Sequence, residues 1–315
     1  MKAKTKLSVW ARSAFALLLS TLCIKPATAY ANIFVTSLNG TIGEYTNSGA
    51  VVNASLITGL NTPVGIAVSG DFLYVTSRDG GTIGKYTTTG QTVNPALVTG
   101  LSNPVGIAIS GDNIFVANVH SFTIGEYTTS GSTVNASLIS NLTVQPEGLA
   151  VVGNQLFFTE NGFTGRVGEA TTSGMNVNEY LIGNLSSPDA ITAAGSHLFV
   201  TGQFPGLVNE FNLDGSVVHS PLITGLNTPY GIAVFDDQLL VTDALNGTIG
   251  AYTTSGQTLN NALISGLNFP IGIAVTSQVN SVPESLSTTW LVITLCSLFV
   301  TARFRNRRGN LPTLV

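Results

Sequence analysis

Residues 72–111 read FLYVTSRDGGTIGKYTTTGQTVNPALVTGLSNPVGIAISG, a stretch with four short β-like runs separated by residues that favour turns. Variants of this stretch fill positions 31–277 in six copies. A repeat period of roughly 20 to 50 residues is the signature of a repeat architecture. Each copy carries a marker proline 41 or 42 residues after the previous one; these are Pro63, Pro104, Pro146, Pro188, Pro229 and Pro270. Four antiparallel strands per repeat predict the blades of a propeller.

The first two strands of each repeat are predicted to form a tight hairpin. A run such as GIAV meets a run such as FLYVT across two residues, and a residue in such a turn must accept positive φ. The connections are Gly70-Asp71, Gly111-Asp112, Gly153-Asn154, Gly195-Ser196 and Asp236-Asp237. A second set of glycines predicts the turn after the third strand: Gly49, Gly90, Gly131, Gly174, Gly215 and Gly256.

Ring closure follows from the two apolar faces of each blade, because a blade can bury both only against a neighbour on either side. The first copy begins at a second strand, and the last ends after a first strand at residues 271–275. We expect this last strand to pair with residues 32–36 as a latch. The predicted fold is therefore an all-β, six-bladed β-propeller of four-stranded antiparallel blades over residues 30–277. The expected repeats are 31–70, 71–111, 112–153, 154–195, 196–236 and 237–277.

The repeats resemble two known families, through LYVTSRDGGTIGKY and IFVANVHSFTIGEY. They are similar to the NHL-type six-bladed propellers and, more loosely, to the YVTN-type surface repeats. Many NHL repeats carry an aspartate after the inner strand in every copy. The chain departs from the NHL pattern because it lacks this aspartate. Since one fold serves many functions, the resemblance implies a propeller and little about chemistry.

The N-terminal residues 1–29 have the features of a secretory signal peptide. Basic residues including Lys2 and Arg12 precede an apolar stretch from Ala14 to Leu22, which is followed by small residues at 27–29. A transmembrane anchor is the alternative, but the apolar stretch is short for one. We therefore expect the protein to be exported.

The C-terminal residues 278–315 resemble a PEP-CTERM sorting signal. Pro283 and Glu284 precede an apolar segment at about 286–302, and a basic tail follows. Basic residues behind a membrane segment fit the positive-inside rule. The resemblance implies processing by an exosortase-type enzyme in a Gram-negative bacterium, with transient anchoring in the inner membrane before release to the cell surface or extracellular matrix. Ser285 stands where many members have a second proline, and an ordinary membrane anchor is the alternative.

The charge distribution changes once the two ends are set aside. Residues 30–277 contain three basic residues, Arg78, Lys85 and Arg166, against 15 acidic residues, so this part has a net charge of −12. Such a body repels nucleic acid and anionic membranes and attracts cations. Both cysteines, Cys23 and Cys296, lie in the ends. The propeller therefore depends on packing between blades and has no disulfide.

The candidate site is predicted from two positions at which the six repeats carry different residues. The residues after the marker prolines are Val64, Val105, Glu147, Asp189, Tyr230 and Ile271, and those ending the second strands are Ser37, Ser77, Asn118, Glu160, Gly202 and Asp243. Regular pairing about the Gly153-Asn154 turn places Glu147 directly opposite Glu160. The same register places Val105 opposite Asn118, Asp189 opposite Gly202 and Tyr230 opposite Asp243, so all these residues are expected to ring one mouth of the channel.

Two carboxylates facing each other repel, and a shared proton or a bound cation relieves the repulsion. The predicted metal ligands are Glu147, Glu160, Asn118, Asp189 and Asp243, and oxygen ligands suit Ca²⁺. Pro146-Glu147-Gly148 also resembles, faintly, the Glu-Gly-Pro opening of gluconolactonase-like propellers, which implies a divalent metal at this mouth. The alternative is that these side chains bond to backbone at the blade edges or face water.

The sequence contains no complete catalytic set. His120, His197 and His219 are expected to fall in different blades at non-equivalent positions, and no metal-binding histidine spacing is present. The favoured hypothesis is a non-enzymatic surface or matrix protein that binds polysaccharide or another protein. A Ca²⁺-dependent gluconolactonase-like hydrolase is the rival, and a spacer without a specific ligand is the third alternative.

Overall fold

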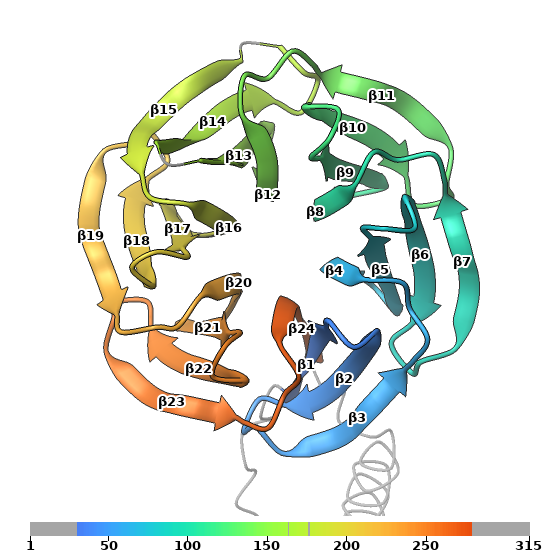
Figure 1. Cartoon of the computed structure of the whole chain (residues 1–315), viewed down its shortest axis with the longest axis vertical. Helices are drawn as coiled ribbons and strands as arrows, with labels where there is room; N and C mark the ends of the chain where they lie inside the picture. The colour runs from blue at the N-terminus through green and yellow to red at the C-terminus, as the bar shows by residue number, and fades with distance from the viewer. Residues whose placement is uncertain (1–29, 163, 176, 279–315) are drawn as a thin grey trace, which may run out of the picture. The chain divides into compact units, whose positions relative to one another are not determined.

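The computed structural model describes residues 30–278 with the exception of 163 and 176. All regular elements of this range are β-strands, and they form six four-stranded antiparallel sheets around a central channel (Figure 1). This confirms the predicted six-bladed propeller. The predicted signal peptide and nearly all of the predicted sorting segment, including Pro283 and Glu284, lie outside the described residues. Within the described range there is no helix with the length and apolarity needed to cross a membrane.

Each blade runs from an inner strand at the channel to an outer strand at the rim (Figure 1). Blade 1 contains β24 (Pro270–Gln278), β1 (Tyr30–Ser37), β2 (Thr41–Thr46) and β3 (Val51–Ile57). Blade 2 contains β4 (Pro63–Ser69), β5 (Phe72–Ser77), β6 (Thr82–Thr87) and β7 (Thr92–Val98). Blade 3 contains β8 (Pro104–Ser110), β9 (Asn113–Asn118), β10 (Thr123–Thr128) and β11 (Thr133–Ile139).

The second half of the ring repeats this order. Blade 4 contains β12 (Gln145–Val152), β13 (Gln155–Asn161), β14 (Gly165–Thr171) and β15 (Asn178–Leu185). Blade 5 contains β16 (Pro188–Ala194), β17 (His197–Gly202), β18 (Leu207–Asn212) and β19 (Val217–Thr224). Blade 6 contains β20 (Pro229–Phe235), β21 (Gln238–Asp243), β22 (Thr248–Thr253) and β23 (Thr258–Ile264).

The turn chemistry behaves as the sequence predicts. The first residue of each two-residue hairpin connection has positive φ, from 51° at Asp236 to 58° at Gly153 and Gly195. The glycines of the turns after the third strands also have positive φ, from 77° at Gly174 to 94° at Gly131. Glycine adopts this backbone region without the steric cost that a Cβ imposes.

The latch is also confirmed, because β24 lies beside β1 in the sheet of blade 1. Near the edge of this pairing, the backbone N–H of Asn32 donates to Thr276 Oγ1 at 3.3 Å. The chain thus closes the ring with its last described strand, and the sheet of blade 1 combines both ends of the repeat region.

The hydrophobic core is divided into six clusters, each shared by two neighbouring blades. At the junction of blades 3 and 4, for example, Phe115 and Ile124 of blade 3 pack in one cluster with Leu156 and Phe158 of blade 4. Burial of apolar area stabilises by about 25 cal/mol per Å². Each blade therefore depends on its two neighbours for the burial of its faces.

Buried threonines connect neighbouring blades in five of the six blades: Thr36, Thr76, Thr159, Thr201 and Thr242. Thr76 Oγ1 accepts a hydrogen bond from the Gly65 N–H of its own blade at 2.8 Å. The same hydroxyl donates to the Val105 carbonyl of the next blade at 2.7 Å. A Cβ on Gly65 would lie 2.2 Å from that carbonyl, so this close approach of the inner strands requires glycine. In blade 3, Ala117 occupies the position that Thr76 occupies in blade 2.

Candidate binding site at the channel mouth

A β-bulge determines which side chains reach the channel mouth. In blade 4, Pro146 pairs with Glu160 and Leu149 pairs with Phe158, so one extra residue is inserted on the inner strand between these pairs. The inner hairpins of blades 2, 3, 5 and 6 have the same insertion. The predicted pairing of Glu147 with Glu160 is therefore wrong by one residue. The equivalent pairings in the other blades are wrong for the same reason: Asn118 lies opposite Pro104, and Asp243 lies opposite Pro229.

The residues after the marker prolines do line the mouth. A cavity of about 370 Å³ there is bordered by the side chains of all six of these residues, and by residues of the adjoining loops. The full lining consists of Leu38, Val64, Arg78, Asn103, Val105, Glu147, Asp189, Gln203, Tyr230, Phe269 and Ile271. The five buried threonines named above each donate to a carbonyl of this ring, those of Val64, Val105, Asp189, Tyr230 and Ile271. The packing between blades thereby fixes the backbone of most of the mouth.

Glu147 and Asp189 form a carboxylate pair in this cavity. Burial and the charge of Asp189 raise the pKa of Glu147, while the guanidinium of Arg78 opposes that shift. Burial also raises the pKa of Asp189, and a hydrogen bond from the Gln203 amide to Asp189 Oδ2 acts in the opposite direction. A pair of this kind retains a proton at a higher pH than two solvated carboxyls do. Of the five residues predicted as metal ligands, Glu147 and Asp189 lie at this cavity.

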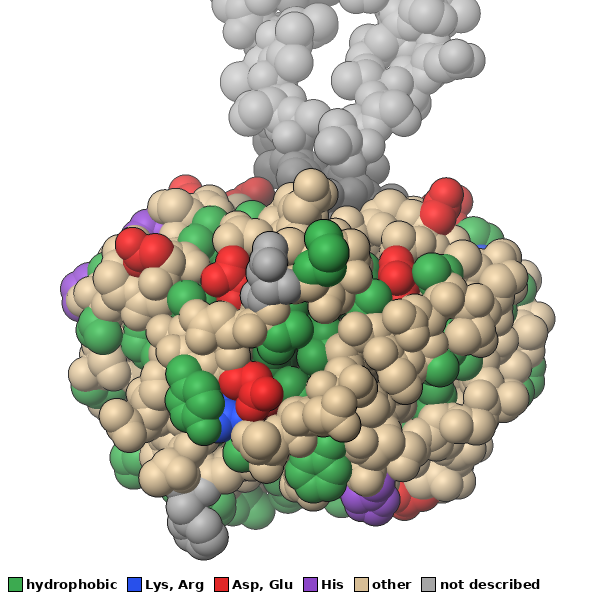
Figure 2. Space-filling model, turned by 90° about the horizontal axis from the view of Figure 1, so that it is seen from above, with side chains coloured by type: hydrophobic (Ala, Val, Ile, Leu, Met, Phe, Trp, Pro, Cys, Tyr) green, Lys and Arg blue, Asp and Glu red, His purple; other side chains and the backbone are tan. Residues whose placement is uncertain are grey.

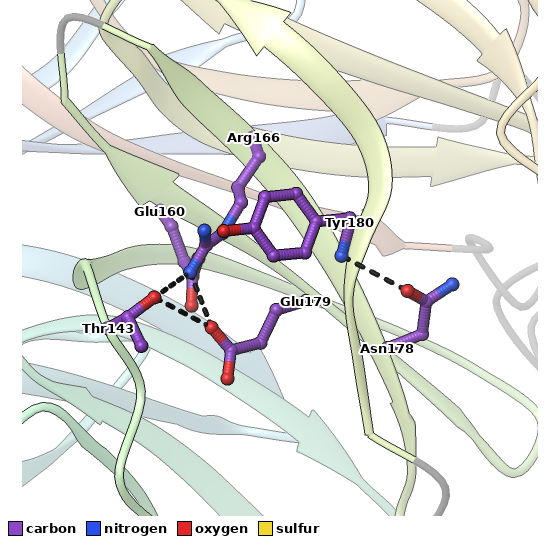
Figure 3. Close-up of polar contacts among 6 residues, drawn as sticks. All are labelled: Thr143, Glu160, Arg166, Asn178, Glu179 and Tyr180. Carbon is purple, nitrogen blue, oxygen red and sulfur yellow. Dashed lines mark hydrogen bonds and ion pairs between the residues drawn. The ribbon is translucent and has the colours of Figure 1, made fainter.

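Glu160 lies in a separate cluster with Arg166, Glu179, Thr143 and Tyr180 (Figure 3). Its carboxylate pairs with Arg166, whose guanidinium also contacts Glu179 Oε2 at 2.5 Å and stacks 4.1 Å from the centroid of the Tyr180 ring. Burial raises the pKa of Glu160 and the contact with Arg166 opposes that shift. The direct contact with the guanidinium favours the charged carboxylate, so Glu160 and Arg166 form a buried ion pair.

Asn118 and Asp243 are also buried away from the mouth cavity. Asp243 accepts hydrogen bonds from the Asn227 N–H at 3.1 Å and from the Asn246 amide at 2.9 Å. This is the backbone-bonding role that the sequence left as an alternative. Asn118 is 3% exposed, and its Oδ1 has no hydrogen-bond partner among the described residues. The five predicted ligands are therefore divided among separate places. Within the described range no group of three or more His, Cys, Asp or Glu residues is arranged to hold a metal ion.

The expectation that the three histidines lie in different blades is wrong for two of them. His197 is the first residue of β17 and His219 lies in β19, so both belong to blade 5. Their Nδ1 atoms approach the two carboxylate oxygens of Glu210, at 3.0 Å for His197 and 2.7 Å for His219. In five blades the position of His219 is an asparagine that bonds its own strand: Asn53, Asn94, Asn135, Asn178 and Asn260. Comparison of the repeats at this position was the signal that could have revealed the cluster.

No family model and no curated protein matches the chain. Solved structures match its fold. One chain of a nidogen/laminin complex is 17% identical with a TM-score of 0.68, and the match covers 78% of this chain and 98% of that one. Virginiamycin B lyase from Staphylococcus aureus is 20% identical with a TM-score of 0.57, covering 81% and 94%. A gluconolactonase from Xanthomonas campestris is 14% identical with a TM-score of 0.59, covering 78% and 90%.

At these identities the likeness shows the fold alone. The three similar structures include a protein complex, a lyase and a lactonase, so the shared architecture serves both binding and catalysis. The fold and the mouth together define the class: a six-bladed β-propeller with an acidic, partly apolar cavity at one end of its channel.

Proposed function

We propose that this protein is an exported binding module of the cell surface or extracellular matrix, and that its channel mouth binds polysaccharide or another protein. The observation that carries the proposal is that the residues at which the repeats diverge after each marker proline all line one cavity. Identical blades would suffice for a spacer, so divergence at a position whose six members border one cavity favours a ligand site.

The two sides of the cavity support binding over catalysis. Carboxylate, amide and phenol groups on one side offer directed hydrogen bonds, and aliphatic side chains on the other offer apolar contact. The gluconolactonase-like alternative needs a bound divalent cation, and the five predicted ligands do not converge. The edge of the ring in Figure 2 is mostly uncharged, with scattered acidic side chains, which suits a solvated extracellular surface.

Binding is tested with full-length protein immobilised and exposed to the extracellular polysaccharide and surface-protein fractions of the producing bacterium. We expect the double variant Glu147→Gln, Tyr230→Ala to lose at least tenfold in retention of one fraction. Asp71→Asn removes a charge from a hairpin turn at the other end of the blade, and retention should be unchanged. Equal retention by the mouth variant and the parent protein, or Ca²⁺-dependent hydrolysis of a lactone lost in Glu147→Gln, would overturn the proposal.

The cellular location of the protein is the second part of the proposal. We infer that residues 1–29 direct export and that Pro283 and Glu284 direct processing by an exosortase-type enzyme. Replacing both by alanine should leave a membrane-bound form that retains its basic tail. Mass spectrometry of the surface-exposed parent protein decides the matter, because an intact tail there would mean a permanent anchor.

A further inference from the structure

The six positions that ring the mouth divide into two contiguous halves. Ile271, Val64 and Val105 come from blades 1, 2 and 3, whereas Glu147, Asp189 and Tyr230 come from blades 4, 5 and 6. Leu38 and Phe269 add apolar surface beside blade 1. The cavity therefore presents an aliphatic wall to one side of a ligand and an acidic wall to the other.

Neither carboxylate of the acidic wall forms a direct ion pair with a described residue, although the charge of Arg78 acts on Glu147. The ion pairs within the described residues involve Glu160, Glu179, Asp79 and Glu210, and none of them includes Glu147 or Asp189. Arg78 borders the cavity, but its Nε lies 3.3 Å from Asp79 Oδ1 in an exposed pair. Two partly desolvated carboxylates that repel each other favour the entry of a positive group.

An aromatic pair lies where the acidic side meets the apolar side, with Tyr230 from blade 6 and Phe269 directly before β24 of blade 1. The rings of Tyr230 and Phe269 are 5.7 Å apart between centroids and inclined by 52°. Aromatic faces attract ammonium and guanidinium groups, and the attraction grows when the cation is desolvated. Carboxylates, aromatic rings and an aliphatic wall together suit an organic cation on an apolar stem, whereas Ca²⁺ requires about six to eight oxygen ligands.

The loops around the mouth add apolar side chains at neighbouring blades. Leu38 follows β1, Phe204 follows β17 and Leu245 follows β21, and these side chains are 44%, 61% and 60% exposed, respectively. Blades 5, 6 and 1 are consecutive in the ring, so these three residues, here called the apolar crescent, lie in loops of neighbouring blades at the end of the propeller where the mouth opens. The net charge of −12 over residues 30–277 further favours a cationic partner.

We propose that the mouth binds a protein segment in which a lysine or arginine side chain enters between Glu147, Asp189 and Tyr230 while apolar neighbours of that residue contact the crescent. This inference rests on the proposed binding function and specifies its partner. The inserted cation pairs with the carboxylates, and its aliphatic stem lies against the wall formed by Val64, Val105 and Ile271.

The test uses full-length protein and the tripeptide acetyl-Leu-Lys-Leu-amide, with binding measured by calorimetry at low salt. The isosteric control replaces lysine by norleucine, which keeps the stem and removes the charge. We expect the norleucine peptide to bind at least tenfold more weakly. The variant Glu147→Gln, Asp189→Asn should weaken binding of the lysine peptide by a similar factor, and Asp71→Asn should leave it unchanged.

Equal affinity for the two peptides, an unchanged affinity in the double variant, or no binding of the lysine peptide overturns the inference. Binding of Ca²⁺ alone that is lost in the double variant, without peptide binding, would instead favour the metal prediction. The proposed binding function is tested by a different experiment: it fails if retention of the bacterial surface fractions does not depend on the residues of the mouth. Mouth-dependent retention of a polysaccharide that the lysine peptide cannot displace would overturn this inference and keep the proposed function.

Discussion

At the residue scale, the Glu147–Asp189 pair should make stability depend on pH. Both carboxyls have a raised pKa in the folded state, to about 8 for Glu147 and about 7 for Asp189, so the folded protein holds more protons than the unfolded chain between about pH 5 and 8. Stability therefore falls as the pH rises through this window. Glu147→Gln removes one of these groups and should flatten the decline, as measured by urea unfolding at pH 5, 6, 7 and 8. Parallel curves for the variant and the parent protein would contradict this, and Asp71→Asn is the matched control.

The Arg166 cluster gives a second residue-scale prediction. Arg166→Met leaves the fully buried Glu160 without its cation, and loss of one partner of a buried ion pair typically costs about 3–5 kcal/mol. The double variant Glu160→Met, Arg166→Met removes both buried charges and should recover most of this loss. Chemical denaturation measures both. A double variant as unstable as the single one would mean that packing by the Arg166 stem, and not the charge pair, is the main contribution.

Single residues were predictable only in part from the sequence. The divergence of Glu147 and Asp189 from the valines of other repeats indicated the mouth correctly. The pairing register of the inner strands could not be predicted from the sequence, because a regular alternation of residues does not reveal an inserted residue. Gly148 and its equivalents inside the inner strands were the available signal, since glycine within a strand often marks a bulge. The partners of Glu160 lie in neighbouring strands and a loop, which no single repeat specifies.

At the scale of the elements, the threonines of the second strands decide how closely the inner strands approach. Thr242→Val removes a hydroxyl that accepts from the Gly231 N–H at 2.7 Å and donates to the Ile271 carbonyl at 3.1 Å. Leaving buried backbone groups without partners costs about 1–3 kcal/mol, so Thr242→Val should destabilise the protein by about this amount.

Conversely, Ala117→Thr introduces in blade 3 the hydroxyl that the other five blades have, and it should stabilise the protein by about 0.5–1.5 kcal/mol. Thermal and urea unfolding measure both, and a destabilised Ala117→Thr protein would show that the junction of blades 3 and 4 lacks room for the side chain.

The turns were the elements best determined by the sequence. A two-residue connection with glycine or aspartate at its first position restricts the backbone to a narrow choice, and the observed φ values agree with it. Strand identity followed from the repeat itself, because six copies of a weak pattern are more informative than one. The blade junctions were not specified in the same way, since they depend on contacts between residues that lie about 29 positions apart, such as Thr76 and Val105.

At the scale of the whole molecule, the ring depends on the latch made by β24. Ile273 and Ala274 are buried in two core clusters, one shared with blade 6 and one with blade 2. Gly272 also donates to Thr36 Oγ1 at 2.8 Å, and the strand covers the edge of β1. Removing β24 therefore exposes two blade faces together with an unpaired strand edge, which is prone to pair with other chains.

Deletion of residues 270–277 should accordingly lower the melting temperature and broaden the transition, because the remaining blades lose closure from both sides. The matched control ends the chain after residue 278, which keeps β24 and removes only residues 279–315. Calorimetry gives the temperature and the cooperativity, and sedimentation reports association through the exposed edge. If the deleted protein melted as sharply and at the same temperature as the control, the terminal strand would be dispensable, and the stability of the propeller would have to come from the blades independently of ring closure.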